Sequence, residues 1–387
     1  MSGPLPKRAS VVVIGGGIHG LACAFNLAQH KVRDLLVLDA GYWQGGASGR
    51  NGSLIRGGFG SPEWTAFFGY SNRCWEALSR TLGHNIMFSQ RGYTVIAHTD
   101  KTAAMLERAV GVHRAHGLRS RMLGQQGTRQ ILPAIAHGTI AGALHLDDGG
   151  IAPHHAVMKG YLAACRARGV EVRYRTKVTR IERSNGAVSA VMVGDERIMA
   201  DTVVIACGAH TPEVAALAGT KVDGYGMRIE AMALEPMRPL IGPAMAIIDK
   251  LCYLHQTPRG EVVGGVEVPE RPRMSLNTDL PVLTATAKAY IELFPQLANV
   301  RILRHWAGML HITQDFGPLM GEHPALRGLW ISAGWSYGWA GGPGAGSLMA
   351  KAIATGTIDE RMRPFAVDRF DRGKPVPDAA VVLAPYS

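Results

Sequence analysis

The sequence predicts an α/β fold with a Rossmann-type dinucleotide-binding unit at its N-terminus and a second region built on an antiparallel sheet. Residues 11–14 form a β-branched run, which is followed by a glycine cluster, a helical segment and the apolar run 35–38. This succession fills about thirty residues, the span of one βαβ unit. Residues 236–267 have the pattern of successive short strands, which favours antiparallel pairing.

The other elements follow in order along the chain. Residues 21–29 are expected to be the first helix, and the glycine-rich stretch 41–60 an extended loop. Further helices are expected at residues 64–82, 102–116, 155–168, 285–294 and 347–355. Further strands are expected at residues 88–98, 170–174, 177–183, 188–193, 202–206 and 329–333. The proline-rich tail after residue 363 is expected to be surface chain or a partner contact.

Length and composition limit the possible functions. A chain of 387 residues can build a large core in two lobes, and 47% hydrophobic with 18% charged residues is an ordinary globular balance. The net charge of +11 favours anionic cofactors and substrates. No dense Lys/Arg run with interleaved aromatic residues is present, so we do not expect nucleic acid as a partner.

The cysteines and the N-terminus indicate the compartment. The five cysteines are far apart and form no CxxC pair: Cys23, Cys74, Cys165, Cys207 and Cys252. This pattern argues against a zinc or iron–sulfur site and against a disulfide framework. The first ten residues contain no apolar stretch typical of a secretory signal or a membrane span. We therefore expect a cytoplasmic protein with no metal and no membrane contact.

A glycine motif carries the cofactor prediction. Residues 15–20 read Gly-Gly-Gly-Ile-His-Gly, in which Gly15 permits the tight turn, Gly17 lets the backbone approach a pyrophosphate, and Gly20 allows close helix–strand packing. Asp39 follows Gly15 by 24 positions, the spacing of a ribose-binding carboxylate. The alternative is a glycine turn of some other α/β protein. The motif alone does not separate FAD from NAD.

Two later segments favour a flavin. The strand that ends at Ala206 and Gly208 resembles the second dinucleotide-binding segment of two-domain flavoproteins. The glycine-rich run at residues 334–344 resembles their flavin-closing loop, whose backbone N–H groups could stabilise negative charge on a reduced flavin.

On these motifs the chain resembles the D-amino-acid-oxidase superfamily of FAD oxidoreductases. Within the superfamily it is most similar to the β subunit of hetero-oligomeric sarcosine oxidase and to related amine and opine dehydrogenases. Similar segments occur in the same order at residues 15–20, 49–56, 88–92, 152–157, 205–209, 313–318 and 334–344. The resemblance implies FAD-dependent oxidation of a C–N bond in a small amine or N-substituted amino acid, with a partner α subunit.

The expected domains are discontinuous. An FAD-binding domain would comprise residues 1–87, 150–220 and 323–387, the last with the C-terminal tail. An α+β substrate domain built on the antiparallel sheet would comprise residues 88–149 and 221–322.

The resemblance also implies site residues. FAD contacts are expected, besides the glycines of the motif, from Ile18, His19, Asp39, Ser48, Gly49, Arg50, Ile55, Val178, Ala206, Gly208, Gly338, Gly341 and Gly342. A guanidinium at Arg50 suits the pyrophosphate, although a solvated loop arginine is the alternative. Arg56 matches an arginine that binds the substrate carboxylate in related amine oxidases, with a structural salt bridge as the alternative.

Three points concern the flavin linkage and the substrate. Monomeric sarcosine oxidases attach FAD to a cysteine where this chain has Gly308, so FAD is expected to be non-covalent. Their carboxylate-binding lysine is replaced near Gly341, which weakens the case for sarcosine itself. In sarcosine oxidase β subunits a histidine carries covalent FMN, and His154 is the positional match here, with helix capping as the alternative reading.

Flavin amine oxidation transfers a hydride equivalent to flavin N5 and requires no acid–base triad. His311, Tyr253 and His255 are candidate pocket residues, although packing roles are the alternative. Two functions of other classes stay open: a nicotinamide-dependent dehydrogenase with the same βαβ unit, and a non-catalytic electron-transfer subunit.

Overall fold

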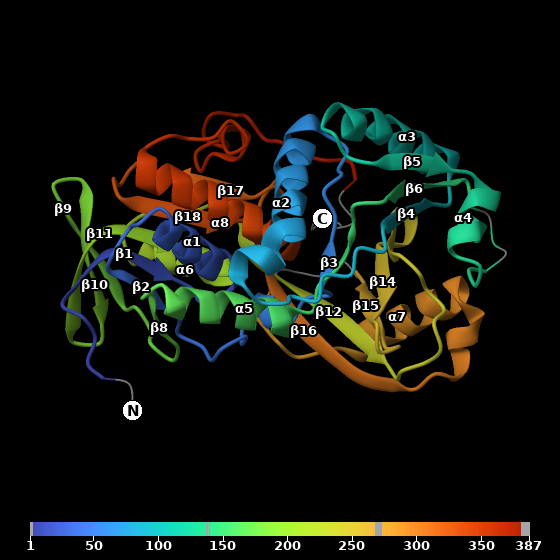
Figure 1. Cartoon of the computed structure of the whole chain (residues 1–387), viewed down its shortest axis with the longest axis horizontal. Coiled ribbons are helices and arrows are strands. Elements are labelled where there is room, and N and C mark those ends of the chain that lie inside the picture. The colour runs from blue at the N-terminus through green and yellow to red at the C-terminus, as the bar shows by residue number, and fades with distance from the viewer. Residues whose placement is uncertain (1–2, 137, 139, 268–272, 381–387) are drawn as a thin grey trace.

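The computed structural model describes residues 3–136, 138, 140–267 and 273–380, and two eight-stranded sheets lie side by side along its long axis (Figure 1). The first sheet has the order β17-β18-β11-β1-β2-β8, and the hairpin of β9 and β10 extends from β11. The second sheet has the order β16-β12-β15-β14-β13-β4-β6-β5. A short pair, β3 (Leu54–Ile55) and β7 (Gly150–Ile151), forms a third sheet.

The first sheet is built on the predicted βαβ unit. β1 (Arg8–Ile14), α1 (Ile18–Gln29) and β2 (Leu35–Leu38) follow one another, and β1 lies parallel to both β2 and β11 (Glu196–Ile205). Their β-branched and leucine side chains are buried on both faces, as parallel strands require. The other strands are β8 (Glu171–Arg173), β9 (Arg180–Ser184), β10 (Ala187–Val193), β17 (Leu319–Glu322) and β18 (Leu329–Ala333).

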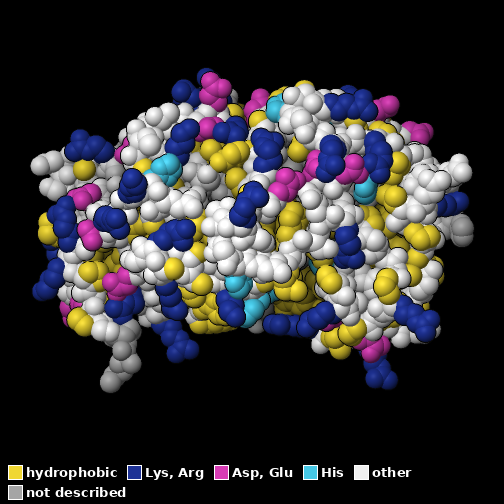
Figure 2. All heavy atoms as spheres, in the orientation of Figure 1, with side chains coloured by type: hydrophobic (Ala, Val, Ile, Leu, Met, Phe, Trp, Pro, Cys, Tyr) yellow, Lys and Arg dark blue, Asp and Glu magenta, His cyan; other side chains and the backbone are white. Residues whose placement is uncertain are grey.

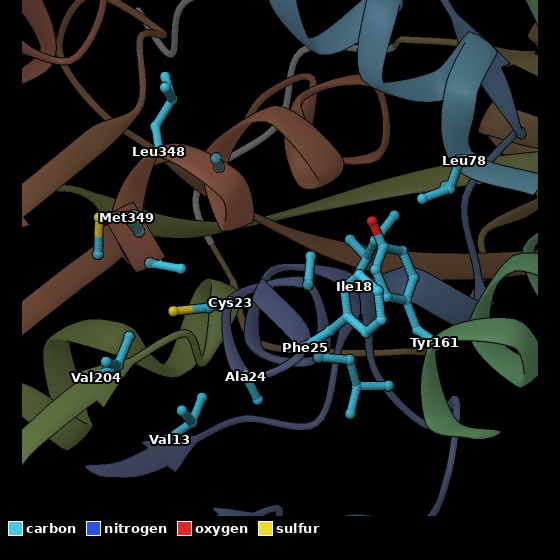
Figure 3. Close-up of a cluster of buried hydrophobic side chains, with 14 of the residues drawn as sticks. Val13, Ile18, Cys23, Ala24, Phe25, Leu78, Tyr161, Val204, Leu348 and Met349 are labelled. Atoms are coloured by element: carbon cyan, nitrogen blue, oxygen red, sulfur yellow. The ribbon is translucent and has the colours of Figure 1, made fainter. Parts of the chain in front are cut away.

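Helices cover this sheet, and two of them approach unusually closely. α1 packs along α8 (Gly338–Thr355), and Figure 3 shows side chains of both helices in one buried cluster. A Cβ at Gly342 would crowd Ile18, and one at Gly346 would overlap Ala22, so glycine is required for this contact. α2 (Pro62–Leu82), α5 (His154–Ala167) and α6 (Thr211–Ala216) complete the helices of this half.

The second sheet is largely antiparallel. Its strands are β4 (Tyr93–Ala97), β5 (Ser120–Leu123), β6 (Gly142–Leu146), β12 (Tyr225–Leu234), β13 (Ala244–Ile247), β14 (Cys252–Gln256), β15 (Val262–Val266) and β16 (Ile302–Ile312). Only the β4–β13 pair among these described strands is parallel. Its helices are α3 (Asp100–Ala115), α4 (Gln125–Ile131) and α7 (Leu280–Leu293).

The structure corrects three predictions from the sequence. The last helix begins at Gly338, not at residue 347, because the glycines that disfavour an isolated helix let α8 pack tightly on its neighbours. Strand β17 pairs with β18 in the first sheet, so the domain boundary predicted at residue 322 lies too late. The tail after residue 363 is not simply surface chain, because Phe365 and Arg369 are fully buried.

Within the described ranges, no helix has both the length and the apolar character needed to cross a bilayer.

Candidate active site

A cavity of about 430 Å³ is lined by residues of both sheets. The face in Figure 2 is hollowed between the two halves, with hydrophobic side chains inside the hollow and basic ones at its rim. The carboxyl ends of the parallel strands open into the cavity: Gly15 follows β1, Asp39 follows β2 and Ala206 follows β11. Ligands of open α/β sheets bind at such strand ends.

The glycine turn has the form that a pyrophosphate requires. Gly15 has φ 112°, and a Cβ there would overlap the carbonyl of Ala206, so only glycine fits. A Cβ at Gly20 would overlap the carbonyl of Gly15, which holds α1 close to β1. Gly17 is the N-cap of α1, and the N–H of Ile18 donates to Ser48 Oγ at 2.9 Å. The cavity therefore contains a helix N-terminus suited to phosphate oxygens.

Two residues predicted to contact the cofactor are held in place by backbone groups. The carboxylate of Asp39 accepts hydrogen bonds from the N–H groups of Gly16 and Gly41, both at 2.7 Å. His19 donates from Nε2 to the carbonyl of Gly338 at 2.9 Å, and its ring stacks on Trp335 with centroids 4.3 Å apart. Burial lowers the pKa of His19 to about 3, so its imidazole is neutral and links α1 to the start of α8.

Arg50 lines the cavity beside the glycine turn. Its guanidinium donates to the carbonyl of Gly45 at 3.0 Å and to the hydroxyl of Tyr42 at 3.1 Å. No carboxylate in the described part of the chain lies within ion-pair distance of it. Its charge is therefore available to a phosphate, which a guanidinium can bind with two hydrogen bonds.

Arg56 is a buried cation that also lines the cavity. It is 3% exposed and donates from Nη2 to the carbonyl of Ala380 at 2.7 Å, while its Nε has no acceptor among the residues that the structure describes. Its Cζ lies 4.1 Å from the ring centroid of Phe59, 4.8 Å from that of Tyr337 and 5.5 Å from that of Tyr93. Among the described residues no carboxylate pairs with it, which disfavours the salt-bridge alternative. The site suits an anionic group of a ligand.

Besides His311 on β16, the second sheet contributes Tyr93 and Tyr253 to the cavity, and Glu267 lines it directly after β15. Tyr253 was predicted as a pocket residue, whereas Tyr93 and Glu267 were missed. Burial is the main cause that raises the pKa of Tyr253, and the charges of Cys252 and then Glu267 raise it further, so its phenol stays protonated. The only sequence signal for Glu267 is an acidic residue directly after a buried strand, and that signal does not indicate which side the residue faces.

Eight of the predicted site residues do not line the cavity: Gly20, Gly49, Ile55, Val178, Gly341, Gly342, His154 and His255. Gly20, Gly341 and Gly342 make room for neighbouring helices and side chains instead. Val178 is 5% exposed and belongs to the core on the other side of the first sheet. His255 contacts the carbonyl of Gly52 through Nε2 at 2.9 Å.

The predicted catalytic histidines are neutral structural links. His311 lines the cavity and accepts a hydrogen bond at Nδ1 from the N–H of Gly334, at 2.9 Å. Burial lowers the pKa of His311 and of His255 to about 4. Neither ring is charged near neutral pH. The hydrogen bonds and burial of both histidines favour a packing role over a role in the reaction.

His154 begins α5 outside the cavity. Burial is the main cause that lowers its pKa, and the charges of His155 and Arg304 lower it further. Arg304 itself lines a shallow polar depression together with Arg50, His305 and others. A neutral imidazole thus lies close to a basic groove.

Comparisons with known proteins agree with this geometry. The sequence pattern of the family described as FAD dependent oxidoreductase matches residues 10–352. The sarcosine oxidase subunit beta of Rhizobium meliloti is 30% identical over 377 residues, which cover 96% of this chain and 90% of that protein. The same subunit of Rhodobacter capsulatus is 28% identical, with 95% and 90% covered. L-proline dehydrogenase from P. horikoshii superposes with a TM-score of 0.91 at 24% identity, covering 96% of this chain and 100% of that one, and confirms the predicted fold.

Proposed function

This chain belongs to the FAD-dependent oxidoreductase family, and from that premise we propose that it oxidises a C–N bond in a small amine or N-substituted amino acid. The observation that carries the substrate class is Arg56, a buried cation in the same cavity as the glycine turn. A buried guanidinium next to a redox cofactor suits a substrate with a carboxylate.

The residues at the strand ends fit FAD. Gly15 and Gly17 leave room for a pyrophosphate at the N-terminus of α1, and Arg50 supplies a positive charge beside it. Asp39 can accept hydrogen bonds from ribose hydroxyls. Gly308 lines the cavity and offers no side chain for attachment, which supports non-covalent binding. When bound, FAD supplies a two-electron acceptor for the amine.

The chain's own residues then bind and shield the substrate. Arg56 holds the carboxylate, and the rings of Phe59, Tyr93 and Tyr337 around it exclude water and strengthen that contact. The backbone N–H groups at the start of α8, near Gly338, favour negative charge on a reduced cofactor. No general base is assigned, because the amine can bind in its neutral form.

Two further parts of the proposal concern a second flavin and a partner subunit. We propose FMN attached at His154, supported by its neutral imidazole and by Arg304 close to it. Two relatives named as beta subunits support a partner α subunit. Extraction and counting of FAD and FMN, followed by peptide mass analysis around His154, tests the flavin assignment. If the His154→Ala variant retained as much covalently bound FMN as the wild type, the assignment would be wrong.

A cytoplasmic location is also proposed, and it rests on the five scattered cysteines, all of which carry free thiols. Fractionation of cells that express the full chain tests it.

The main test is anaerobic titration of the purified protein. A bound flavin spectrum, bleached by one of sarcosine, proline derivatives, glycine or opines, is the expected result. A protein that binds nicotinamide and no flavin would be a nicotinamide-dependent dehydrogenase. A flavin that no amine reduces would indicate an electron-transfer subunit.

A further inference from the structure

The tail of the chain returns to the residues that surround Arg56. Ala380 is 3% exposed, and its carbonyl accepts the hydrogen bond from Arg56 Nη2 at 2.7 Å. Two residues before Ala380, the carboxylate of Asp378 accepts hydrogen bonds from the backbone N–H groups of Gly60 at 3.0 Å and Ser61 at 2.6 Å. The tail therefore contacts both ends of the segment that leads from Arg56 into α2.

Asp378 also fixes the position of the Ala380 carbonyl. Its Oδ1 accepts a hydrogen bond from the N–H of Ala380 at 2.8 Å, the bond that an aspartate side chain forms with its own backbone two residues further on. One carboxylate thus binds three N–H groups, two in front of α2 and one in the tail. Hydrogen bonds to a charged acceptor are stronger than those between neutral groups, so this link between tail and loop is firm.

The loop before α2 is itself held in place. The carbonyl of Phe59 contacts His113 Nε2 at 2.8 Å and accepts a hydrogen bond from Thr65 Oγ1 at 3.1 Å. The ring centroid of Phe59 lies 4.1 Å from Arg56 Cζ. The guanidinium therefore has two fixed neighbours, a ring of this loop and a carbonyl of the tail, and Asp378 ties the loop to the tail.

We propose that Asp378 is a positioning residue for the substrate-binding cation: it holds the Ala380 carbonyl where that oxygen fixes the Arg56 guanidinium for a carboxylate ligand. The inference rests on the proposed function, in which Arg56 binds the substrate carboxylate. A free arginine side chain has many rotamers, and restraining them costs free energy when a ligand binds. A guanidinium that is restrained beforehand spares the substrate this cost. Asp378 acts only through Arg56 and touches no substrate.

The preference of the flavin-bound full chain for an acid over its neutral amide tests the inference. Sarcosine, proline and glycine are each compared with their carboxamide, and dissociation constants are taken from anaerobic titrations of the flavin spectrum. The wild type is expected to bind the acid more tightly. Asp378→Ala is expected to weaken binding of the acid by about 3- to 10-fold, the range for one lost hydrogen bond, and to leave binding of the amide nearly unchanged. Asp378→Asn, which keeps one acceptor oxygen, should show a smaller loss.

Asp249→Ala is the matched control for a merely structural effect. The Asp249 carboxylate likewise accepts hydrogen bonds at the start of a helix, from the N–H of His98 and the hydroxyl of Thr102 beside α3, but it does not line the cavity. Its removal should lower the melting temperature and leave the preference for the acid unchanged. An equal loss of acid binding in both alanine variants would overturn the inference. So would an equal weakening of acid and amide in Asp378→Ala.

Arg56→Met separates this inference from the proposed function. If Asp378 acts through Arg56, adding Asp378→Ala to Arg56→Met should cause no further loss of acid binding, because the residue through which Asp378 acts is gone. A further loss of the same size in the double variant would refute the inference while Arg56 keeps its role. If Arg56→Met alone keeps the wild-type preference for the acid, the carboxylate role of Arg56 in the proposed function is wrong, and the inference fails with it.

Discussion

Replacing Arg369 by methionine is expected to lower the free energy of unfolding by about 3–5 kcal/mol, the cost of leaving one partner of a buried ion pair. Arg369 and Asp315 have side chains only 1% and 2% exposed. Their two hydrogen bonds measure 2.6 and 2.9 Å, and Arg369 also donates to the carbonyls of Gly317 and Pro318. Methionine removes all of these donors while Asp315 stays buried.

The size of the effect depends on pH. Burial alone would raise the pKa of Asp315, but the hydrogen bonds and charge of Arg369 and the N–H groups of Val376 and Gly317 lower it overall. A lowered carboxyl pKa contributes stability above the unfolded value of about 4, and this contribution is lost as the pH falls through the folded value. The difference between wild type and Arg369→Met should therefore shrink below about pH 4.

Urea unfolding followed by tryptophan fluorescence measures the difference. Arg372→Met is the matched control, because Arg372 lies in the same segment and pairs with Asp368 at the surface. An exposed pair of this kind contributes about 0–1 kcal/mol. If both variants unfold at the same urea concentration, the reasoning about the buried pair is wrong.

Three further predictions concern the cavity and the buried histidines beside it. Gly15→Ala should purify without FAD, because its Cβ would overlap the Ala206 carbonyl; flavin absorbance after gel filtration measures this, and full flavin content would contradict it. Arg56→Met should raise KM for carboxylate-bearing amines by about 10- to 100-fold and leave uncharged amines unchanged in steady-state assays. His255 and His311 have lowered pKa values of about 4, so the unfolded chain binds protons first as the pH falls. Their contribution to stability is complete above about pH 6.5 and declines toward pH 4, and His255→Asn should flatten this part of the unfolding profile.

Local sequence signals predicted the cofactor half of the site. The β-branched run, the glycines and Asp39 all lie between residues 11 and 39. Each has a structural or binding role that only certain residue types can fill. The resemblance added Arg50 and Arg56, and the structure brings both to the cavity. These predictions required no knowledge of distant contacts.

The substrate half was less predictable, for physical reasons. β12 was not predicted because Arg228 and Glu230 interrupt its apolar pattern, and only the fold shows that they pair with each other in the interior at 3.0 Å. Tyr93 and Glu267 line the same cavity although 174 positions separate them, since the pairing of β4, β13, β14 and β15 in one sheet brings both there. The first residues of α8 were likewise predicted to be a loop, because they are rich in glycine.

The carbonyl of Ala380 accepts a hydrogen bond from the Arg56 guanidinium, so a residue 324 positions further along the chain completes the surroundings of this cation. Cleavage of the chain between Arg369 and Ala380 would therefore remove this acceptor while the glycine turn before α1 keeps its own contacts.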